Sequence, residues 1–189
     1  MKINGRLIIF TLLLVALATA CKFFFGPNLD WSGFSPVIAI ALFSGMIMKQ
    51  KDISFVLPLI SVFISDAVIQ LLYEQGLFAY PGFYNGQWKN YILLLLPATL
   101  IGWLLKGKNY KNIFIGAIGA PTFFFLASNF NVWFSSEVIY SRDFNGLMNC
   151  YASGLPFYRN ALIGTLVFLP VILFIYNYLT RKKAALVVA

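Results

Sequence analysis

The sequence has no histidine and few charged residues. Of its 189 residues, 11% are charged and 6 are acidic, whereas an average soluble domain is about 25% charged. The absence of histidine excludes histidine-based catalytic triads, histidine metal sites and the common histidine proton shuttle. A glycine-rich phosphate-binding loop is also absent, so we expect no ATP hydrolysis by this chain itself, no cofactor and no metal site.

Cysteine is scarce as well. Cys21 and Cys150 are the only two, and both are predicted to lie near the same face of a membrane. They could form a disulfide in an oxidising periplasm, or either could ligate a soft metal centre carried by a ligand. We expect them to be unpaired, because Cys21 lies at a helix end and Cys150 lies in a loop.

The sequence instead contains six apolar stretches, in a composition that is 60% hydrophobic. A membrane-spanning helix needs about 20 apolar residues. We therefore predict an all-α fold in which residues 1–189 form a single transmembrane domain, a bundle of six helices. The predicted spans cover residues 7–25, 31–48, 53–72, 91–105, 113–133 and 157–179.

Each of the last four predicted spans contains a proline in its interior. Proline removes a helical hydrogen bond and tends to kink the helix, which a membrane tolerates where a neighbour or a cavity satisfies the backbone. Such kinks favour a bundle with one splayed end and a pocket. The alternative is that proline is simply commoner in membrane helices. The four prolines are Pro58, Pro97, Pro121 and Pro170.

The basic residues fall on alternate connections between these spans. Ten of the 14 lie on one side: Lys2, Arg6, Lys49, Lys51, Lys106, Lys108, Lys111, Arg181, Lys182 and Lys183. Lys22, Lys89, Arg142 and Arg159 lie on the other. Short loops rich in lysine and arginine stay in the cytoplasm, so both termini are predicted to be cytoplasmic in a multi-pass protein of the bacterial inner membrane. Attraction to anionic lipid explains the net charge of +8, and no nucleic-acid partner is expected.

The first stretch also resembles a secretory signal. Residues 1–21 have a basic start, an apolar run over 7–17 and the triplet Ala18-Thr19-Ala20, which has the form of a signal-peptidase site. With Cys21 next, the segment is also similar to a lipoprotein box. Cleavage would leave five spans and an external N-terminus. We expect an uncleaved first helix.

Asp66 is the most informative single residue, because it lies in the outer half of the third span. A carboxylate inside a membrane costs about 3 kcal/mol on insertion scales and is a candidate for function. Gln70 and Tyr73 follow at i+4 and i+7 on the same helix face. The structural alternative is that Asp66 caps a broken backbone or pairs with a basic residue.

The fifth and sixth spans also turn polar towards the outer side. Asn129 and Trp133 belong to a stripe that recurs every four residues, and Arg159 and Asn160 open the sixth span. We expect Arg159 to lie near Asp66, either directly or across a ligand.

The outer connections are long and aromatic, with Trp88 and Tyr151 among their residues. Aromatic rings often form a belt at the membrane interface, but loops of this length are usually functional, and rings beside polar groups suit a flat organic ligand. The predicted substrate-binding residues are Asp66, Gln70, Tyr73, Trp88, Asn129, Trp133, Tyr151, Arg159 and Asn160.

This architecture resembles the substrate-binding S component of energy-coupling factor vitamin transporters. Four local patterns are also similar to an uncharacterised bacterial membrane protein family that has been likened to S components. They are Phe34-Ser35-Pro36 with Ala39 to Gly45; Pro58 with Ser65-Asp66; Asn129 to Trp133; and Pro156-Phe157 with Asn160 to Leu162.

The resemblance implies capture of a vitamin-like molecule on the outer side, under loops that close as a lid. It also implies a scaffold subunit and two ATPases as partners, with docking through small residues spaced as A-x-x-x-A in the first helix. Ala16 and Ala20 have that spacing, although they lie nearer the outer half than the family's motif. Such pairs are also common helix-packing faces in membrane proteins.

Three functions are consistent with these sequence features. The first is a transport protein that binds a small substrate and is no enzyme. The second is a structural or assembly protein without a ligand, in which Asp66 and Arg159 pair statically and no pocket exists. The third is an intramembrane enzyme with Asp66 as general base, although a lone carboxylate without a partner acid, histidine or metal is a thin catalytic set.

Overall fold

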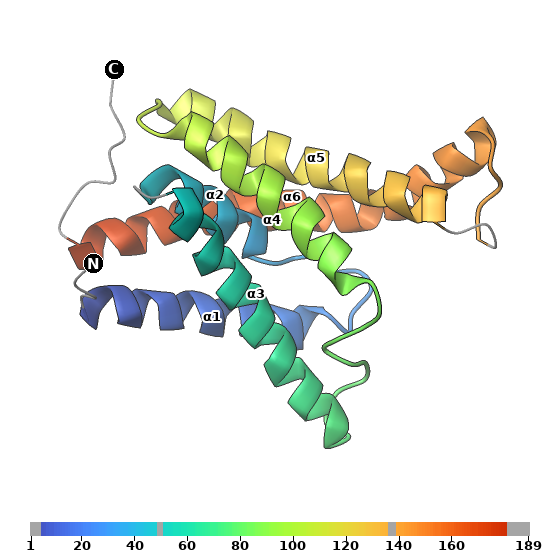
Figure 1. The fold of residues 1–189 in the computed structure, drawn as a ribbon, viewed down its shortest axis with the longest axis horizontal. Helices are drawn as coiled ribbons and strands as arrows, with labels where there is room; N and C mark the ends of the chain where they lie inside the picture. The colour runs from blue at the N-terminus through green and yellow to red at the C-terminus, as the bar shows by residue number, and fades with distance from the viewer. Residues whose placement is uncertain (1–4, 49–50, 136–138, 181–189) are drawn as a thin grey trace.

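The protein is all-helical over the residues that its computed structural model describes, which are 5–48, 51–135 and 139–180 (Figure 1). The predicted basic residues Lys2, Lys49, Arg181, Lys182 and Lys183 lie outside them. The six helices are α1 (Gly5–Phe25), α2 (Val37–Ile47), α3 (Lys51–Glu74), α4 (Gln87–Leu105), α5 (Tyr110–Ser135) and α6 (Phe144–Thr180).

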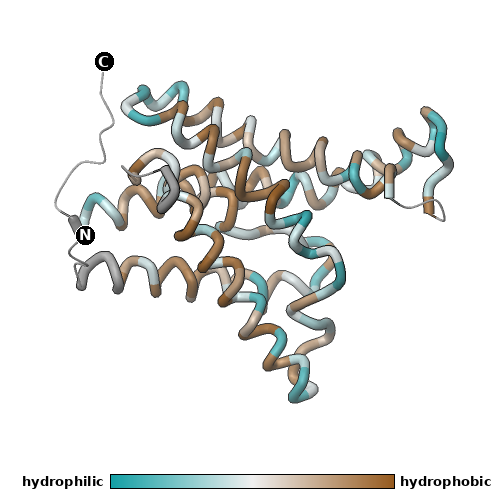
Figure 2. Tube along the Cα trace, in the orientation of Figure 1, coloured by the Kyte–Doolittle hydropathy of each residue, from teal (hydrophilic) through white to brown (hydrophobic). Residues whose placement is uncertain are grey.

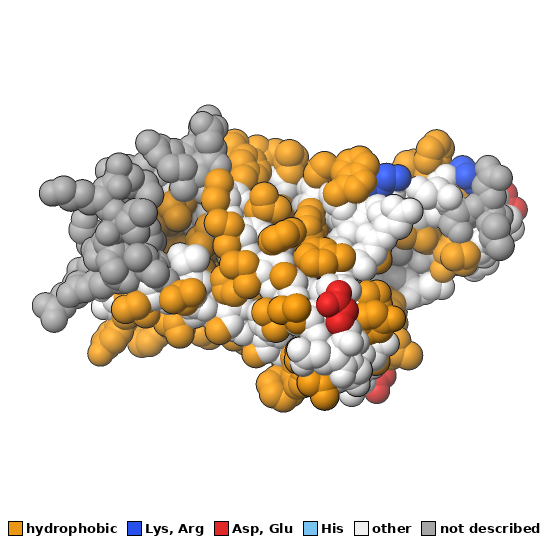
Figure 3. Space-filling view, turned by 60° about the horizontal axis from the view of Figure 1, so that its bottom comes forward, with side chains coloured by type: hydrophobic (Ala, Val, Ile, Leu, Met, Phe, Trp, Pro, Cys, Tyr) orange, Lys and Arg blue, Asp and Glu red, His pale blue; other side chains and the backbone are white. Residues whose placement is uncertain are grey.

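Four of these helices are long and apolar enough to cross a membrane. They are the segments Ser54–Glu74, Gln87–Leu105, Tyr110–Ser135 and Phe144–Leu179, while Ile9–Phe25 and Val37–Ile47 are shorter apolar helices. Hydrophobic residues dominate the middle of the bundle, and hydrophilic ones gather at helix ends and connections (Figure 2). Figure 3 shows a face that is largely covered by hydrophobic side chains. An exposed apolar surface of this extent indicates a membrane protein.

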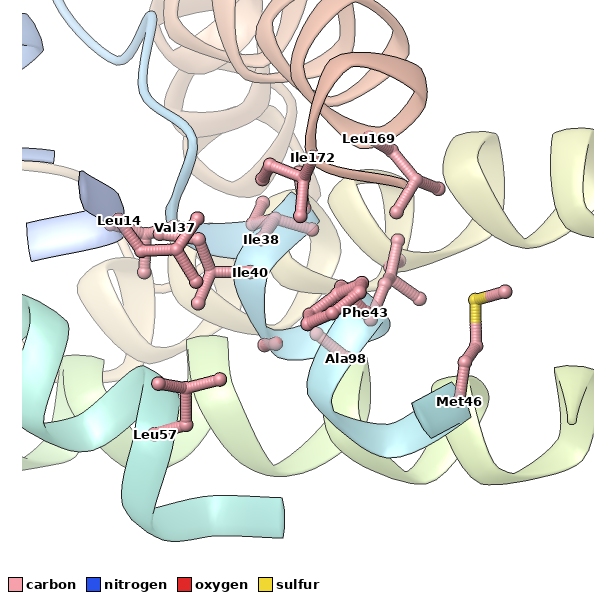
Figure 4. Close-up of a cluster of buried hydrophobic side chains, with 14 of the residues drawn as sticks. Leu14, Val37, Ile38, Ile40, Phe43, Met46, Leu57, Ala98, Leu169 and Ile172 are labelled. Carbon is pink, nitrogen blue, oxygen red and sulfur yellow. The ribbon is translucent and has the colours of Figure 1, made fainter. Parts of the chain in front are cut away.

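Helix α2 is shorter than the predicted second span over 31–48 and forms the centre of the bundle. Its residues Val37–Met46 are all buried, as expected for a helix that is hydrophobic all round. Figure 4 shows its side chains surrounded by those of α1, α3, α4 and α6. The helix begins late because the residue before Pro36 is biased away from helical geometry, and because Gly33 has a positive φ of 89°. Residues 26–36 are therefore an irregular segment.

Close packing around α2 depends on small residues and aromatic rings. A Cβ atom on Gly45 of α2 would meet the main-chain oxygen of Thr99 on α4, and one on Gly102 would meet the oxygen of Leu42. The two glycines therefore let the α2 and α4 backbones touch. On the other side of α2, the rings of Phe43 and Phe10 lie 5.3 Å apart.

Helix α6 begins much earlier than the predicted sixth span, at Phe144 instead of 157. Asp143 caps it, because its Oδ1 accepts hydrogen bonds from the Gly146 amide at 2.7 Å and from the Ser141 hydroxyl at 2.8 Å. Residues 144–156, predicted as loop, are thus helical, and the helix continues through Pro156. Figure 1 shows α5 and α6 side by side, extending beyond the other helices.

Candidate functional site

A cavity of about 700 Å³ lies at one end of the bundle. It is lined by the late residues of α1, α3 and α5, the early residues of α2, α4 and α6, and the segments that connect α1 to α2 and α3 to α4. The opposite end of the bundle holds the α4–α5 connection with Lys106 and Lys108, and Lys111 in the first turn of α5 (Figure 1). The cavity reaches the surface, because its lining residues Tyr84 and Phe157 are 52% and 44% exposed.

Asp66 lies in the wall of this cavity and is fully buried. Its Oδ1 pairs with the ammonium group of Lys22 on α1. Its Oδ2 accepts hydrogen bonds from Gln87 Nε2 at 2.6 Å and from the Tyr91 hydroxyl, both on α4. One carboxylate therefore joins α1, α3 and α4, and it satisfies the requirement that a buried charge be paired and hydrogen-bonded.

The basic partner of Asp66 is not the one expected. The predicted neighbour, Arg159, instead donates from Nη2 to the main-chain oxygen of Asp30 at 3.1 Å and from Nε to Asn160 Oδ1 at 3.3 Å. A direct Asp66–Arg159 pair is therefore wrong for this structure. Lys22 takes its place because it lies in the last turn of α1, which packs beside α3.

Asn160 and Arg159 bind the protein's own backbone. Asn160 is 2% exposed, and its Nδ2 donates to the oxygens of Asp30 at 2.8 Å and Ser32 at 2.9 Å. Neither residue is part of the cavity lining. In this structure they hold the 26–36 segment against α6, and that segment carries Phe34 and Ser35 into the cavity wall.

Gln70, Tyr73 and Trp88 also lie outside the cavity lining. Gln70 Oε1 accepts a hydrogen bond from the Phe83 amide at 3.1 Å, and its Nε2 donates to Glu74 at 2.9 Å. Gln70 thus fixes the α3–α4 connection to α3. Tyr73 and Trp88 are 42% and 62% exposed, as expected for rings at a membrane interface.

Among the predicted residues on α5 and α6, too, some line the cavity and others do not. Asn129 lines the cavity, whereas Trp133 and Tyr151 do not. Trp133 Nε1 donates to the Ser141 oxygen at 2.9 Å, and the Tyr151 hydroxyl donates to the Leu126 oxygen at 3.0 Å. Of the nine predicted substrate-binding residues, the structure brings Asp66 and Asn129 to the cavity.

The cavity contains residues that were not among the predicted site residues. Lys22, Gln87 and Tyr91 complete the Asp66 site, and the Phe125 and Tyr158 rings stack 4.8 Å apart at an interplanar angle of 28°. One signal was available, because Lys22 is a basic residue inside an apolar stretch, at the same predicted depth as Asp66. Gln87 and Tyr91 share a helix face at i and i+4, but Gln87 lies in the predicted loop and Tyr91 is the first residue of the predicted fourth span.

The remaining predictions concern small residues and cysteines. Ala16 and Ala20 line a second, apolar groove of about 540 Å³, formed by α1 and α3. Cys21 and Cys150 are both buried and free. Within the described ranges, no three His, Cys, Asp or Glu side chains are grouped so that they could hold a metal ion.

The cavity can bind a small molecule through two kinds of lining group: polar groups around Asp66 from α1, α3 and α4, called here its polar end, and aromatic rings from α5 and α6. At the polar end the Lys22–Asp66 pair contributes no net charge, because the two unit charges cancel. The Phe125 and Tyr158 rings, with Phe124 and Phe157, form an apolar wall. A concave site with a few placed polar groups and a mainly apolar wall is the usual form of a small-molecule site.

The comparison with known protein families gives one match. The profile described as "Family of unknown function (DUF6580)" matches residues 1–186. No curated protein matches the chain, and no solved structure does. Since the match extends over nearly the whole chain, the protein belongs to the family of unknown function DUF6580.

Proposed function

We propose that the protein crosses the bacterial inner membrane six times, with both termini in the cytoplasm, and captures a small organic molecule from the outer side for transport. The observation that carries this proposal is the 700 Å³ cavity with a buried ion pair in its wall, inside an apolar bundle. Ionisable residues within a membrane mark substrate pathways more often than they serve packing alone.

The chain path supports the proposed topology. Helix α1 ends at the cavity, and α2 ends at the opposite side of the bundle beside the Lys106 side chain, which donates to the Met48 oxygen at 3.4 Å. Although the 11 residues of α2 reach only about 16 Å, the 26–36 segment completes that crossing. The lysines of the α4–α5 connection then lie on the cytoplasmic side under the positive-inside rule, and the cavity lies on the outer side.

The same cavity argues against a purely structural role. Its volume falls within the range of about 300–1,000 Å³ typical of ligand sites, and a protein built only for packing has no use for such a space. Catalysis by Asp66 is also disfavoured, because both of its oxygens are engaged by Lys22, Gln87 and Tyr91. A general base needs access to a substrate proton.

Partner subunits form the second element of the proposal. In a transporter of the kind that the sequence resembles, a scaffold subunit and ATPases supply the energy that this chain lacks. The apolar groove that contains Ala16 and Ala20 is the face that we assign to the scaffold, because close helix packing in lipid uses small residues.

The proposal is tested by native mass spectrometry of protein extracted gently from its own membrane. Ala161 lines the cavity, so Ala161→Phe should fill part of it and abolish retention of a small molecule. The matched control is Ala152→Phe, at an exposed position on the same helix. A metabolite present in the wild type and control but absent in Ala161→Phe supports capture. Lipid alone, retained equally by all three, contradicts it.

A further inference from the structure

At the polar end of the cavity, some polar groups make all their hydrogen bonds within the protein and others do not. Asp66 has Lys22 on one oxygen and both Gln87 and Tyr91 on the other, and it is 0% exposed. A cationic group of a ligand therefore cannot reach this carboxylate without displacing its partners. The acceptor capacity of the Asp66 carboxylate is already used.

Gln87 and Tyr91 are also fully engaged. Gln87 Oε1 accepts from the Tyr84 amide at 3.1 Å, and its Nε2 has the Gly82 oxygen at 3.1 Å as a further acceptor. The Tyr91 hydroxyl donates to Asp66 and lies 3.0 Å from Gln87 Nε2, which can donate to it. Both side chains serve to hold the carboxylate and leave nothing for a ligand.

Lys22 differs from these residues. An ammonium group has three N–H donors, and among the described residues Asp66 is the one acceptor given to Lys22. Its side chain is 31% exposed and lines the cavity. Two of its three N–H bonds are therefore available to an acceptor on a molecule that enters the cavity.

Two tyrosine hydroxyls add to this donor set. Tyr80 and Tyr84 both line the cavity. The Tyr84 hydroxyl accepts a hydrogen bond from Asn90 Nδ2, so its own hydrogen is free to be donated. The structure gives the Tyr80 hydroxyl no acceptor among the described residues, and this side chain lies against Gly26, where a Cβ atom would contact it. Lys22, Tyr80 and Tyr84 therefore each have a hydrogen available for donation at this end.

We infer that the captured molecule is an organic carboxylate with a flat aromatic body. Its carboxylate accepts hydrogen bonds from Lys22, Tyr80 and Tyr84, and its ring lies against the Phe125 and Tyr158 rings. This inference rests on the proposed capture function and names its substrate class. Asp66 is then a positioning residue, which holds the Lys22 ammonium and does not touch the ligand.

A singly charged carboxylate suits the site better than a phosphate. The donors are one ammonium group, whose charge Asp66 already balances, and two neutral hydroxyls. Phosphate sites usually include an arginine fork, and no arginine lines the cavity. Hydrogen bonds from a charged donor to a charged acceptor are roughly twice as strong as neutral ones, so the ligand's charge should dominate its selection.

The test uses two matched sets of probes with the full-length protein in lipid nanodiscs. The first set is indole-3-acetate, indole-3-acetamide and tryptamine; the second is phenylacetate, phenylacetamide and phenethylamine. Each set keeps the ring and changes the charge from negative to neutral to positive. Calorimetric titration should give at least one acid that binds about tenfold more tightly than its amide, consistent with a charge-assisted hydrogen bond, and no binding of its amine.

Two variants tie this preference to the site. Lys22→Gln should remove the preference for the acid, whereas Lys89→Gln, an equal charge change beside the exposed Trp88 ring, should keep it. Tyr84→Phe should weaken acid binding several-fold. The Tyr84 side chain is half exposed, so this change should have little effect on folding. It keeps the inference testable if Lys22→Gln does not fold.

The outcomes separate the two proposals. Amides or amines that bind as tightly as the acids, with binding lost in Ala161→Phe, overturn the carboxylate assignment and leave capture by the cavity standing. Acids that bind equally well to wild type and Lys22→Gln also overturn the assignment. Failure of all six probes to bind the wild type overturns it as well, and the mass-spectrometric comparison then decides the capture function by itself.

Discussion

The side-chain amide of Asn160 holds the main-chain oxygen of Asp30, 130 positions earlier in the sequence, at 2.8 Å. Its second hydrogen bond, to the Ser32 oxygen, is 2.9 Å long. Between these two contacts and Pro36 lies a segment without regular structure, and Gly33 of that segment packs against the main chain of Phe157. One buried amide on α6 therefore holds in place the 26–36 segment, which forms part of the cavity wall.

Replacing Asn160 by leucine should loosen that wall. Three hydrogen bonds are lost, two to the 26–36 segment and one from Arg159 Nε. Each is worth about 0.5–1.5 kcal/mol net, so we expect the free energy of unfolding to fall by about 1.5–4.5 kcal/mol. Hydrogen exchange at residues 30–34 should become faster. Unfolding by sodium dodecyl sulfate in mixed micelles measures the first effect. Asn149→Leu, at an exposed position on the same helix, is the control. Equal losses in both variants would contradict a specific role for Asn160.

The Lys22–Asp66 pair predicts strong coupling in a double-mutant cycle. Lys22→Met and Asp66→Asn should each destabilise the protein by roughly 3 kcal/mol, because each leaves its partner's charge unpaired. The double variant should lose much less free energy of unfolding than the sum of the two single variants. The same detergent unfolding measures all three. Additive losses would mean that the two side chains do not interact in the membrane-embedded protein.

Gly82 is predicted to tolerate no side chain. A Cβ atom there would meet the main chain of α3 at Asp66 and Gln70. Gly82→Ala should therefore displace the α3–α4 connection, weaken the Gln87–Asp66 hydrogen bond and cost about 1–3 kcal/mol, as overpacking does. Gly119→Ala on α5 is the matched control, since a Cβ atom there meets nothing within 4 Å. It should be neutral or slightly stabilising, because alanine favours helix.

Asp143 should make the start of α6 sensitive to acid. The Gly146 amide and then the Ser141 hydroxyl hold the pKa of this carboxyl below its ordinary value, which is about 3.9. Because the pKa is lower in the folded state, the stabilisation is fully present above the ordinary value and is lost as the pH falls through the lowered one.

Hydrogen exchange of the Gly146 amide as a function of pH checks this prediction. After correction for the intrinsic exchange rate, protection should fall in that acidic range in the wild type. In Asp143→Asn, protection should not change with pH over the same range. A wild-type profile equal to that of the variant would show that Asp143 does not cap the helix.

The prediction of helices from sequence works where an apolar run has clear ends. Helices α3 and α5 begin and end within a few residues of their predicted spans, because charged or polar residues bound the apolar runs. The prediction of a loop over residues 144–156 was wrong, because their aromatic and polar composition resembles that of a loop although they are helical. Asp143, directly before Phe144, was the available capping signal.

The candidate site was only partly predictable, for a physical reason. The cost of burying a carboxylate identifies Asp66 from the sequence alone. Which cation pairs with it depends on how α1 packs beside α3, and Lys22 and Arg159 both lie at a suitable depth. Likewise, the polarity of Asn160 and Gln70 makes them candidates for a site. Their roles are decided by loop backbone groups, whose positions no periodic pattern encodes.

The complete burial of α2 has a consequence for biogenesis. The helix is too short to be retained in the bilayer as an independent span, and it packs mainly against α4, α3 and α6, all synthesised later. The N-terminal third of the protein therefore cannot settle when it leaves the ribosome. We expect a nascent chain that stops before α6 to have an incomplete core, because the contacts between α2 and α6 are then missing.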